Sequence, residues 1–198
     1  MLRCISSAIS ASVRPPQDLN LEPFGLTPDS YWKHCVAVLS FAEELASRGL
    51  ANFGSEFSTA ALLHDFGKLI LARHISPAQA EAMQRIDPAI PGTRRELEVL
   101  SVHHGEVTAV VAQTWKLSDA LVQAVQHHHT VDLCDTPLCH GLNIANQLAW
   151  QLEEREFDLA READSLQLSR SALKLSDSTL QSIYADGVTR LEASLEVY

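Results

Sequence analysis

Apolar side chains recur at spacings of three and four residues along most of the chain, which is the period of amphipathic helices. No segment shows the sustained alternation of apolar and polar residues that is typical of a half-buried strand. We therefore predict an all-α fold. The expected helices cover residues 27–48, 56–72, 77–85, 93–115, 118–129, 136–154 and 176–195.

Residue types that cap helices mark where most of these segments begin. Thr93 and Glu96 have the spacing of a capping box and predict the start of one long helix. Gly49 predicts the end of the first helix. Four further starts carry a capping side chain, at Thr27, Ser118, Thr136 and Ser176.

The composition divides the chain into three parts. We expect an N-terminal helix and a proline-rich loop in residues 1–26, a helical core in 27–155 and a C-terminal helical extension in 156–198. Residues 153–178 are charged and serine-rich and show no obvious deep core. The last helix has an apolar stripe that packs on the body of the chain or, alternatively, on a partner helix. The stripe consists of Leu180, Ile183, Tyr184, Val188, Leu191 and Leu195.

The charge balance disfavours several classes of function. The 198 residues include 25 acidic and 15 basic side chains, which gives a formal charge of −10. This negative field disfavours binding to nucleic acids or anionic lipids, and the basic pair Arg94-Arg95 is isolated. No stretch is long and apolar enough to span a membrane, and we find no signal peptide. We therefore expect a cytoplasmic protein without nucleic-acid or membrane partners.

The four cysteines favour a reduced protein over a disulfide framework, since none forms a C-x-x-C pair. We expect Cys35 to be a small buried hydrophobe. Cys134 and Cys139 lie near His140, but no second pair completes a zinc site, so we interpret this segment as a loop. The sequence also has no G-x-S-x-G, G-x-G-x-x-G or Walker pattern, which argues against those hydrolase and nucleotide-binding classes.

Nine histidines are the most informative feature of the composition, because several share a helical face with apolar residues. One histidine in such a position is usually a hydrogen-bonded core residue. Several on different helices favour a shared metal site, since buried imidazoles are costly unless they are hydrogen-bonded or ligated. The histidines expected to face inward are His34, His64, His104, His128 and His129.

Asp65 directly follows His64 and adds an oxygen donor to the nitrogen donors. This mixture suits one divalent transition metal such as Mn, Fe, Zn or Ni better than a thiolate site would. Any phosphate handled by so acidic a chain would need a locally positive site, most simply such a metal.

The segment around His64 and Asp65 resembles the H-D signature of the HD superfamily, whose enzymes are metal-dependent phosphohydrolases. The wider pattern resembles one branch, the HDOD domain (HD-related output domain) of bacterial signalling proteins, over about residues 27–196. This resemblance implies an HD-domain-like helical bundle. The segments that carry it are Tyr31–His34, Ala61–Lys68, Glu98–Val107, Trp115–Ser118, Gln126–Thr130 and Ile144–Ala149.

The resemblance also implies roles for particular residues. Lys68 corresponds to a lysine that helps hold a phosphate in hydrolytic relatives, and an ion pair with Asp65 is the alternative. If the chain is an enzyme, Lys68 and Asp65 are its catalytic candidates. The pair His127/His128 is an alternative register for the last two ligands. The implied metal ligands are His34, His64, Asp65, His104, His128 and His129.

Two positions depart from the hydrolytic pattern. The aspartate that closes the site in hydrolytic members corresponds to Asn146, and the acidic residue one turn before the first histidine corresponds to Ser30. With one carboxylate left, we expect weak or single-ion binding. A neutral amide is also a poor base for a metal-bound water. No G-Y-P-like loop follows His129, which argues against hydrolysis of cyclic dinucleotides.

These departures favour a non-catalytic signalling module that acts through protein contacts. A metal-dependent phosphohydrolase acting on a nucleotide or phosphate ester is the alternative, and a helical structural domain with merely buried histidines is a third. HDOD domains usually have a further helical half before the part matched here, so we expect a short variant or a half supplied by another chain. Exposed apolar surface would then favour a protein partner or a homo-oligomer.

Overall fold

The computed structural model describes residues 14–153 and 164–196, and these residues form helices without strands. The predicted all-α class is confirmed. The expected N-terminal helix falls mostly on residues 1–13, outside the described range. The elements are η1 (Glu22–Phe24), α2 (Pro28–Ser47), α3 (Phe57–Leu63), α4 (Phe66–His74), α5 (Pro77–Arg85), α6 (Gly92–Leu100), α7 (His104–Thr114), α8 (Asp119–His127), η2 (Val131–Leu133), α9 (Pro137–Glu153), α10 (Asp164–Ala172) and α11 (Asp177–Leu195).

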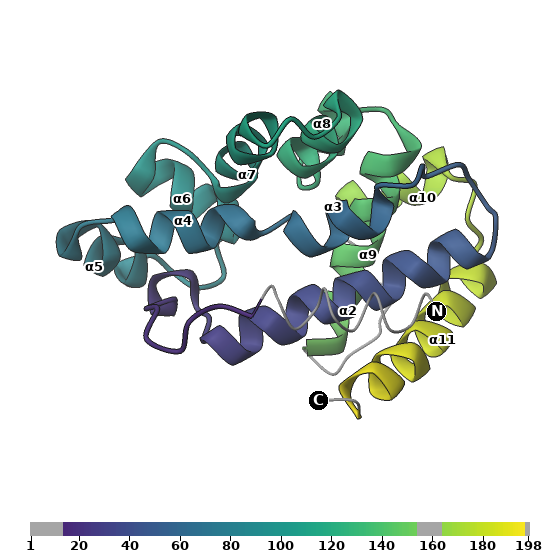
Figure 1. Ribbon diagram of the computed structural model, residues 1–198, viewed down its shortest axis with the longest axis horizontal. Helices are drawn as coiled ribbons and strands as arrows, with labels where there is room; N and C mark the ends of the chain where they lie inside the picture. The colour runs from purple at the N-terminus through teal and green to yellow at the C-terminus, as the bar shows by residue number, and fades with distance from the viewer. Residues whose placement is uncertain (1–13, 154–163, 197–198) are drawn as a thin grey trace.

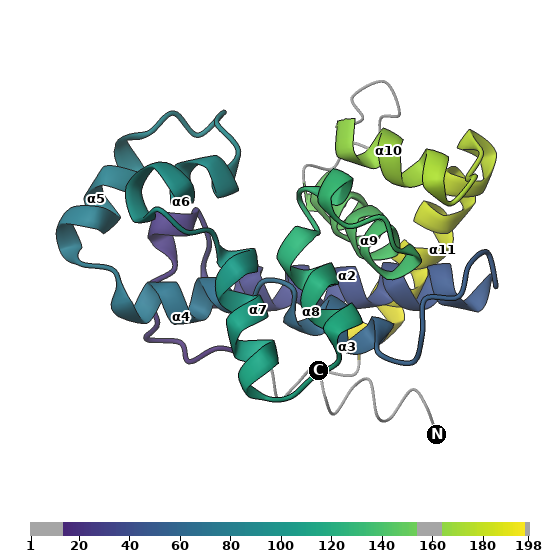
Figure 2. The same ribbon diagram turned by 90° about the horizontal axis from the view of Figure 1, so that it is seen from above.

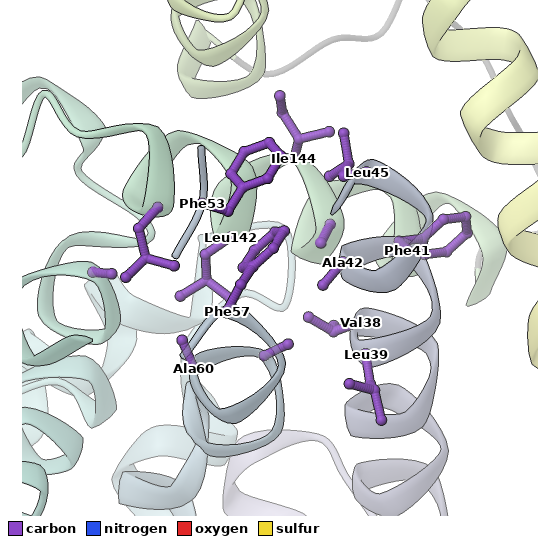
Figure 3. Close-up of a cluster of buried hydrophobic side chains, with 14 of the residues drawn as sticks. Val38, Leu39, Phe41, Ala42, Leu45, Phe53, Phe57, Ala60, Leu142 and Ile144 are labelled. Carbon is purple, nitrogen blue, oxygen red and sulfur yellow. The ribbon is translucent and has the colours of Figure 1, made fainter. Parts of the chain in front are cut away.

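Helix α2 is the central element, and α3, α9 and α11 pack around it (Figure 1). Its apolar face is completely buried at Phe41 and Leu45. Phe53 and Phe57 stack with ring centroids 4.6 Å apart and fill the space between α2, α3 and α9 (Figure 3). Burial of this face, rather than helix propensity alone, holds the four helices together.

Helices α4, α5 and α6 form a smaller layer with η1 at one end of the molecule (Figure 2). This layer has its own apolar cluster, which includes Leu21, Tyr31, Leu69 and Met83. Because Tyr31 belongs to α2, the central helix joins the two apolar clusters. The boundary between them is the place where α2 meets the junction of α3 and α4.

Most of the predicted helix starts are confirmed. Thr27 and Ser30 form a reciprocal capping box at the start of α2, and Pro28 occupies its first turn. Ser118 caps α8 and Ser176 caps α11, each through the backbone N–H three residues later. The bounds of α5 match the expected helix at 77–85.

Two predicted long helices are wrong, because each is divided in two. The segment 56–72 breaks at His64 and Asp65, and 93–115 breaks where Ser101 adopts a φ of 59°. The expected capping box at Thr93 is absent, since Pro91 precedes α6 without a side-chain cap. The capping box in this stretch belongs to His103, which caps α7 together with Glu106. Both breaks position side chains for contacts between helices, which local periodicity does not reveal.

The C-terminal region also differs in part from the expectation. Helix α10 buries Leu166 and Ser169 completely, so the prediction of no deep core in 153–178 is wrong for its described part. The stripe on α11 packs along α2, with Leu180 and Ile183 completely buried. That outcome confirms the interpretation in which the stripe packs on the chain's own body. Within the described residues, no helix has the length and apolar character to cross a bilayer.

Candidate metal centre

The candidate ligands come from separate elements that meet between α2, α4, α7 and the end of α8. His34 lies in the N-terminal half of α2, and His104 is the first residue of α7. His64 and Asp65 form the junction of α3 and α4, and the pair His128/His129 follows α8. Five of these six side chains are at least 97% buried, and His129 is half-buried. The structure therefore brings together all six residues that the resemblance implies.

Asp65 stands between two groups of histidines. Its Oδ1 atom lies 3.0 Å from Nε2 of His104 and 3.9 Å from Nε2 of His128. Its Oδ2 atom lies 3.5 Å from Nε2 of His64 and 3.9 Å from Nε2 of His34. Lys68 also reaches Oδ2, with Nζ 2.6 Å away. The two oxygens of one carboxylate thus face two different sets of nitrogen atoms.

Hydrogen bonds fix the orientation of three imidazoles. The Nδ1 atom of His64 donates to the carbonyl of Ala61 at 2.8 Å, and that of His128 donates to the carbonyl of Val125 at 2.7 Å. The Nδ1 atom of His104 donates to the carboxylate of Glu96 at 2.7 Å. In each ring Nε2 is the atom turned toward Asp65, as in histidines that bind metals.

Gly67 allows α4 and α7 to approach closely enough to complete this arrangement. A Cβ atom at this position would lie 2.0 Å from the carbonyl oxygen of His104. The hydroxyl of Thr108 accepts from the N–H of Gly67 at 2.8 Å and lies 3.1 Å from the carbonyl of His64. Thr108 thereby satisfies backbone groups that the break between α3 and α4 exposes.

Unpartnered atoms indicate that the cluster fits a cation. Within the described residues, Asp65 Oδ1 and His128 Nε2 are buried without a hydrogen bond. Asp65 Oδ1 nevertheless lies 3.0 Å from Nε2 of His104, the distance of an ion pair when His104 is protonated. Asn146 Nδ2 also lacks a partner, but as an amide donor it suits an acceptor rather than a cation. A divalent ion is the kind of partner that an orphaned carboxylate oxygen and imidazole nitrogen share.

In each of two sets of residues, the donor atoms all lie within 4.8 Å of one another, so each set can hold a metal ion. One consists of Asp65, His104, His128 and His129, and the other of His34, His64 and Asp65. A third set contains Glu96, His103 and His104, but both Glu96 oxygens already contact the His104 ring. The first two sets share Asp65, whose two oxygens point one to each.

The charges within the cluster are coupled. Burial raises the pKa of Asp65, but Lys68, His64 and His104 lower it more, so the net pKa is well below its usual range. Burial lowers the pKa of His64 to about 4, which leaves this imidazole neutral. Burial and Lys68 also lower the pKa of His104, but Asp65 and Glu96 raise it more, and the net shift is upward.

Glu96 is the residue of this site that sequence reasoning missed. It is 1% exposed, and its Oε2 atom also accepts the backbone N–H of His104 at 2.7 Å. The sequence predicts only a capping role for Glu96, and the segment that carries the family resemblance begins at Glu98, which is exposed. The period of α6 carried the only sequence signal, since an acidic side chain two residues from Glu98 lies on a different face.

The remaining candidates have defined places. Asn146 Oδ1 lies 3.0 Å from Nε2 of His34, so Asn146 lies beside the cluster. The side chain of Ser30 is engaged with Thr27 at the start of α2. His127 lies outside the cluster, with Nδ1 3.3 Å from the hydroxyl of Thr130. The structure therefore favours the register with His128 and His129 over the alternative.

Two of the cysteine expectations can be compared with the structure. Cys35 is buried, as expected. His140 contacts Asp135 at 2.9 Å and Ser169 at 3.1 Å rather than a cysteine, and no set of metal-ligating atoms among the described residues includes Cys134 or Cys139.

A cavity of about 490 Å³ lies beside the cluster. Lys68, His104 and His129 form its inner wall, so the site is reachable by a small molecule. The outer walls come from the segment before α6, the start of α6 and the end of α9. Trp150 of α9 lies in this wall, and its ring is 5.4 Å from the ring of His34.

A comparison with protein-family models shows the family to which the chain belongs. A model described as HDOD domain matches residues 15–131. The chain belongs to the HDOD domain family. The match includes every histidine of the cluster and Asp65 but ends before Asn146, so the place of Asn146 in the site rests on the structure.

Three solved structures share the HDOD fold at low sequence identity. A candidate phosphohydrolase from Shewanella amazonensis SB2B is 22% identical with a TM-score of 0.65, over 96% of this chain and 70% of that chain. An HDOD domain protein with unknown function from Geobacter sulfurreducens is 19% identical with a TM-score of 0.65, over 90% and 67%. The MmoQ response regulator from Methylococcus capsulatus str. Bath is 22% identical with a TM-score of 0.55, over 78% and 60%. No curated protein matches the chain.

Proposed function

We propose that the chain is a regulatory HDOD module of a bacterial signalling pathway that holds one divalent ion and does not turn over phosphate esters efficiently. The observation that carries the proposal is the unequal use of Asp65. Its Oδ1 atom is buried without a hydrogen bond and faces only histidines, His104, His128 and His129, whereas its Oδ2 atom is engaged by Lys68.

The histidine set around Oδ1 supports the binding of one ion. Nitrogen donors combined with a carboxylate suit Mn, Fe, Zn or Ni. Glu96 lies behind His104 and accepts its Nδ1–H. This hydrogen bond fixes the ring and makes Nε2 a stronger metal ligand. The protein therefore supplies a second carboxylate close to the ion without using it as a ligand.

The opposite side of the cluster supports low hydrolytic activity. A metal in such a site supplies an activated water when bound, and hydrolysis also needs a nearby group that accepts the proton of that water. Asn146 is neutral and lies next to His34. The resemblance to the HD superfamily implies an aspartate at this position in hydrolytic members. Nζ of Lys68 lies 2.6 Å from Oδ2 of Asp65 and neutralises this carboxylate, so Asp65 is a poor proton acceptor.

A metal-dependent phosphohydrolase is the second candidate, and one observation favours it. The cavity of about 490 Å³ opens onto Lys68, His104 and His129, where a phosphate ester would meet both a cation and the cluster. The substrate would be a nucleotide or another phosphate ester of similar size. Asp65 and Lys68 would then be its catalytic residues.

Contacts with another protein would transmit the signal. Several large apolar side chains are exposed on α6, α7 and the turn after α7, including Leu97, Val110 and Trp115. Exposed apolar side chains of this kind suit a protein partner or a second copy of the chain. The MmoQ response regulator has the same fold, which agrees with a signalling role.

A turnover assay separates the two candidates. Bis(p-nitrophenyl) phosphate and p-nitrophenyl phosphate are offered to the untagged protein with added Mn²⁺. We expect no turnover above that of His64→Ala, because the closing carboxylate is missing. Turnover by the wild type that is abolished in His64→Ala would overturn the regulatory proposal in favour of the hydrolase.

A further inference from the structure

The cavity beside the cluster has an outer part that the metal site does not use. This part is lined by the start of α6 and by one face of α9. Gln147, Trp150 and Gln151 are three and four residues apart, so all three project from the same face of α9. Arg95 lies on the α6 side of the cavity.

The α6 side is built to receive an anion. No ion pair of Arg95 is found among the described residues, and its Nε atom is buried without a hydrogen bond. The side chain turns toward the first residue of α6, because a Cβ atom at Gly92 would lie 3.8 Å from Nη2 of Arg95. Pro91 gives α6 no side-chain cap, so the first backbone N–H groups of the helix add to the positive potential there.

The acidic neighbour of Arg95, Glu96, is engaged by His104 rather than by Arg95. Glu96 also lines the cavity, but both of its oxygens contact the His104 ring, and one also accepts the backbone N–H of His104. The other cation in the wall, Lys68, is committed to Asp65. Arg95 is therefore the cation that remains for a ligand among the residues that line the cavity.

The α9 side is built to receive a flat ring. Trp150 is 38% exposed although it packs against His34, so part of its indole surface remains open to the cavity. Gln151 carries a buried Oε1 atom without a hydrogen-bond partner, which is an acceptor for a ring N–H or an amino group. Aromatic stacking combined with amide hydrogen bonds is a common way to bind a nitrogen heterocycle.

We propose that this cavity binds a 5′-mononucleotide, with its phosphate at Arg95 and the start of α6 and its base on Trp150 beside Gln151. A volume of about 490 Å³ falls in the range of small-molecule sites and is too small for a polymer. The proposal rests on the proposed function in one respect, since it makes the nucleotide the signal that the regulatory module detects. It does not require hydrolysis.

The test is calorimetric titration of the full chain with the 5′-monophosphates of adenosine, guanosine, cytidine and uridine, first with EDTA and then with Mn²⁺. We expect at least one to bind with a dissociation constant of about 1 mM or tighter. Ribose 5-phosphate and the matching nucleoside should each bind more weakly, because each occupies only one side of the cavity.

Three variants locate the binding site. Arg95→Gln should weaken nucleotide binding about tenfold or more, since it removes a charge-assisted hydrogen bond to phosphate. Arg94→Gln is the matched control, because Arg94 is exposed on the same helix and should have no effect. Trp150→Leu should weaken binding of the nucleotide but not of ribose 5-phosphate. Arg95→Lys keeps the charge and serves as a second variant if Arg95→Gln unfolds.

Binding of none of the four nucleotides at millimolar concentration would overturn the inference. Binding that is unchanged in both Arg95→Gln and Trp150→Leu would also overturn it. The ion content of the same preparations keeps this result separate from the proposed function. An ion retained without nucleotide binding contradicts only the inference, whereas nucleotide binding without a retained ion contradicts only the metal proposal.

Discussion

The two sides of Asp65 differ in how completely the protein satisfies its own polar groups. On one side, Asp65 Oδ1 and His128 Nε2 are buried without hydrogen bonds. On the other side, Lys68 engages Oδ2 and Asn146 accepts from His34. On the first side the carboxylate oxygen and an imidazole nitrogen are therefore left for a cation, whereas on the second side the ammonium of Lys68 already neutralises the carboxylate oxygen. This difference predicts that a single ion binds, and it identifies the side.

The largest expected effect is that of Asp65→Ala, which removes the carboxylate that both sides share. The ion should be lost completely, and the metal-free protein should lose about 3–5 kcal/mol of unfolding free energy, because Lys68 is left as an unpaired buried charge. Urea unfolding of the variant measures this loss. Asp65→Ala combined with Lys68→Met should recover most of the stability but none of the metal binding. Equal unfolding free energies of the single and the double variant would show that loss of Asp65 does not leave Lys68 as a costly unpaired charge.

Acid should destabilise the metal-free protein. The pKa of His64 is about 4 in the fold against 6.5 in the unfolded chain, so the unfolded chain takes up the proton first. The neutral His64 contributes its full share of the unfolding free energy above pH 6.5. This contribution falls by about 3 kcal/mol as the pH decreases to 4. His104 acts in the opposite direction, because its pKa is raised in the fold. Urea unfolding in EDTA across this range should show a weaker dependence for His64→Gln, and an identical dependence would contradict the assignment of His64 as neutral and buried.

Gly67→Ala tests whether the contact between α4 and α7 forms the cluster. The added Cβ atom would meet the His104 carbonyl, and we expect a loss of about 1–3 kcal/mol together with weaker ion retention. Thermal melting and elemental analysis measure the two effects. Gly92→Ala is the control, because its nearest neighbour would be a flexible arginine end at 3.8 Å. Full ion retention in Gly67→Ala would show that the cluster does not need this close approach.

Glu96→Gln affects only the side with His104. The amide still accepts the Nδ1–H of His104 but without a charge, so the affinity for the ion should fall about 10–100-fold. Competition with a chelator measures the affinity. Glu98→Gln, which changes an exposed position of the same helix, should leave the affinity unchanged. Equal affinities of the two variants for the ion would show that the charge of Glu96 does not strengthen ion binding by His104.

Asn146→Asp affects only the side with His34 and His64. The substitution introduces a carboxylate in place of the amide, whose Nδ2 atom has no hydrogen bond. It should raise the affinity for a second ion about tenfold or more. Titration with Mn²⁺ followed by elemental analysis measures the second ion. An unchanged ion count would show that Asn146 is not at the closing position of the metal site.

The sequence could predict those parts of the molecule that depend on local signals. Thr27, Ser118 and Ser176 fix helix starts through hydrogen bonds that span three residues, so a short segment contains all the information. The resemblance to the HDOD family indicated which histidines belong to one site, and the structure brings these histidines together. These predictions needed no knowledge of how the helices pack.

The parts that could not be predicted depend on contacts between distant residues. The break at His64 and Asp65 is stabilised by Thr108, which lies 44 residues from His64 along the chain. Glu96 acts on His104 only because the chain turns at Ser101 between α6 and α7. In both stretches the apolar period continues across the break, so a continuous helix was the local expectation.

The most direct test of the account is the ion content of untagged protein and of one histidine variant from each side of Asp65. Elemental analysis should find about one divalent ion per chain in the wild type. The ion should be lost in His128→Ala and retained in His34→Ala. A wild type without any ion, or an ion that is lost in His34→Ala and retained in His128→Ala, would contradict the central claim.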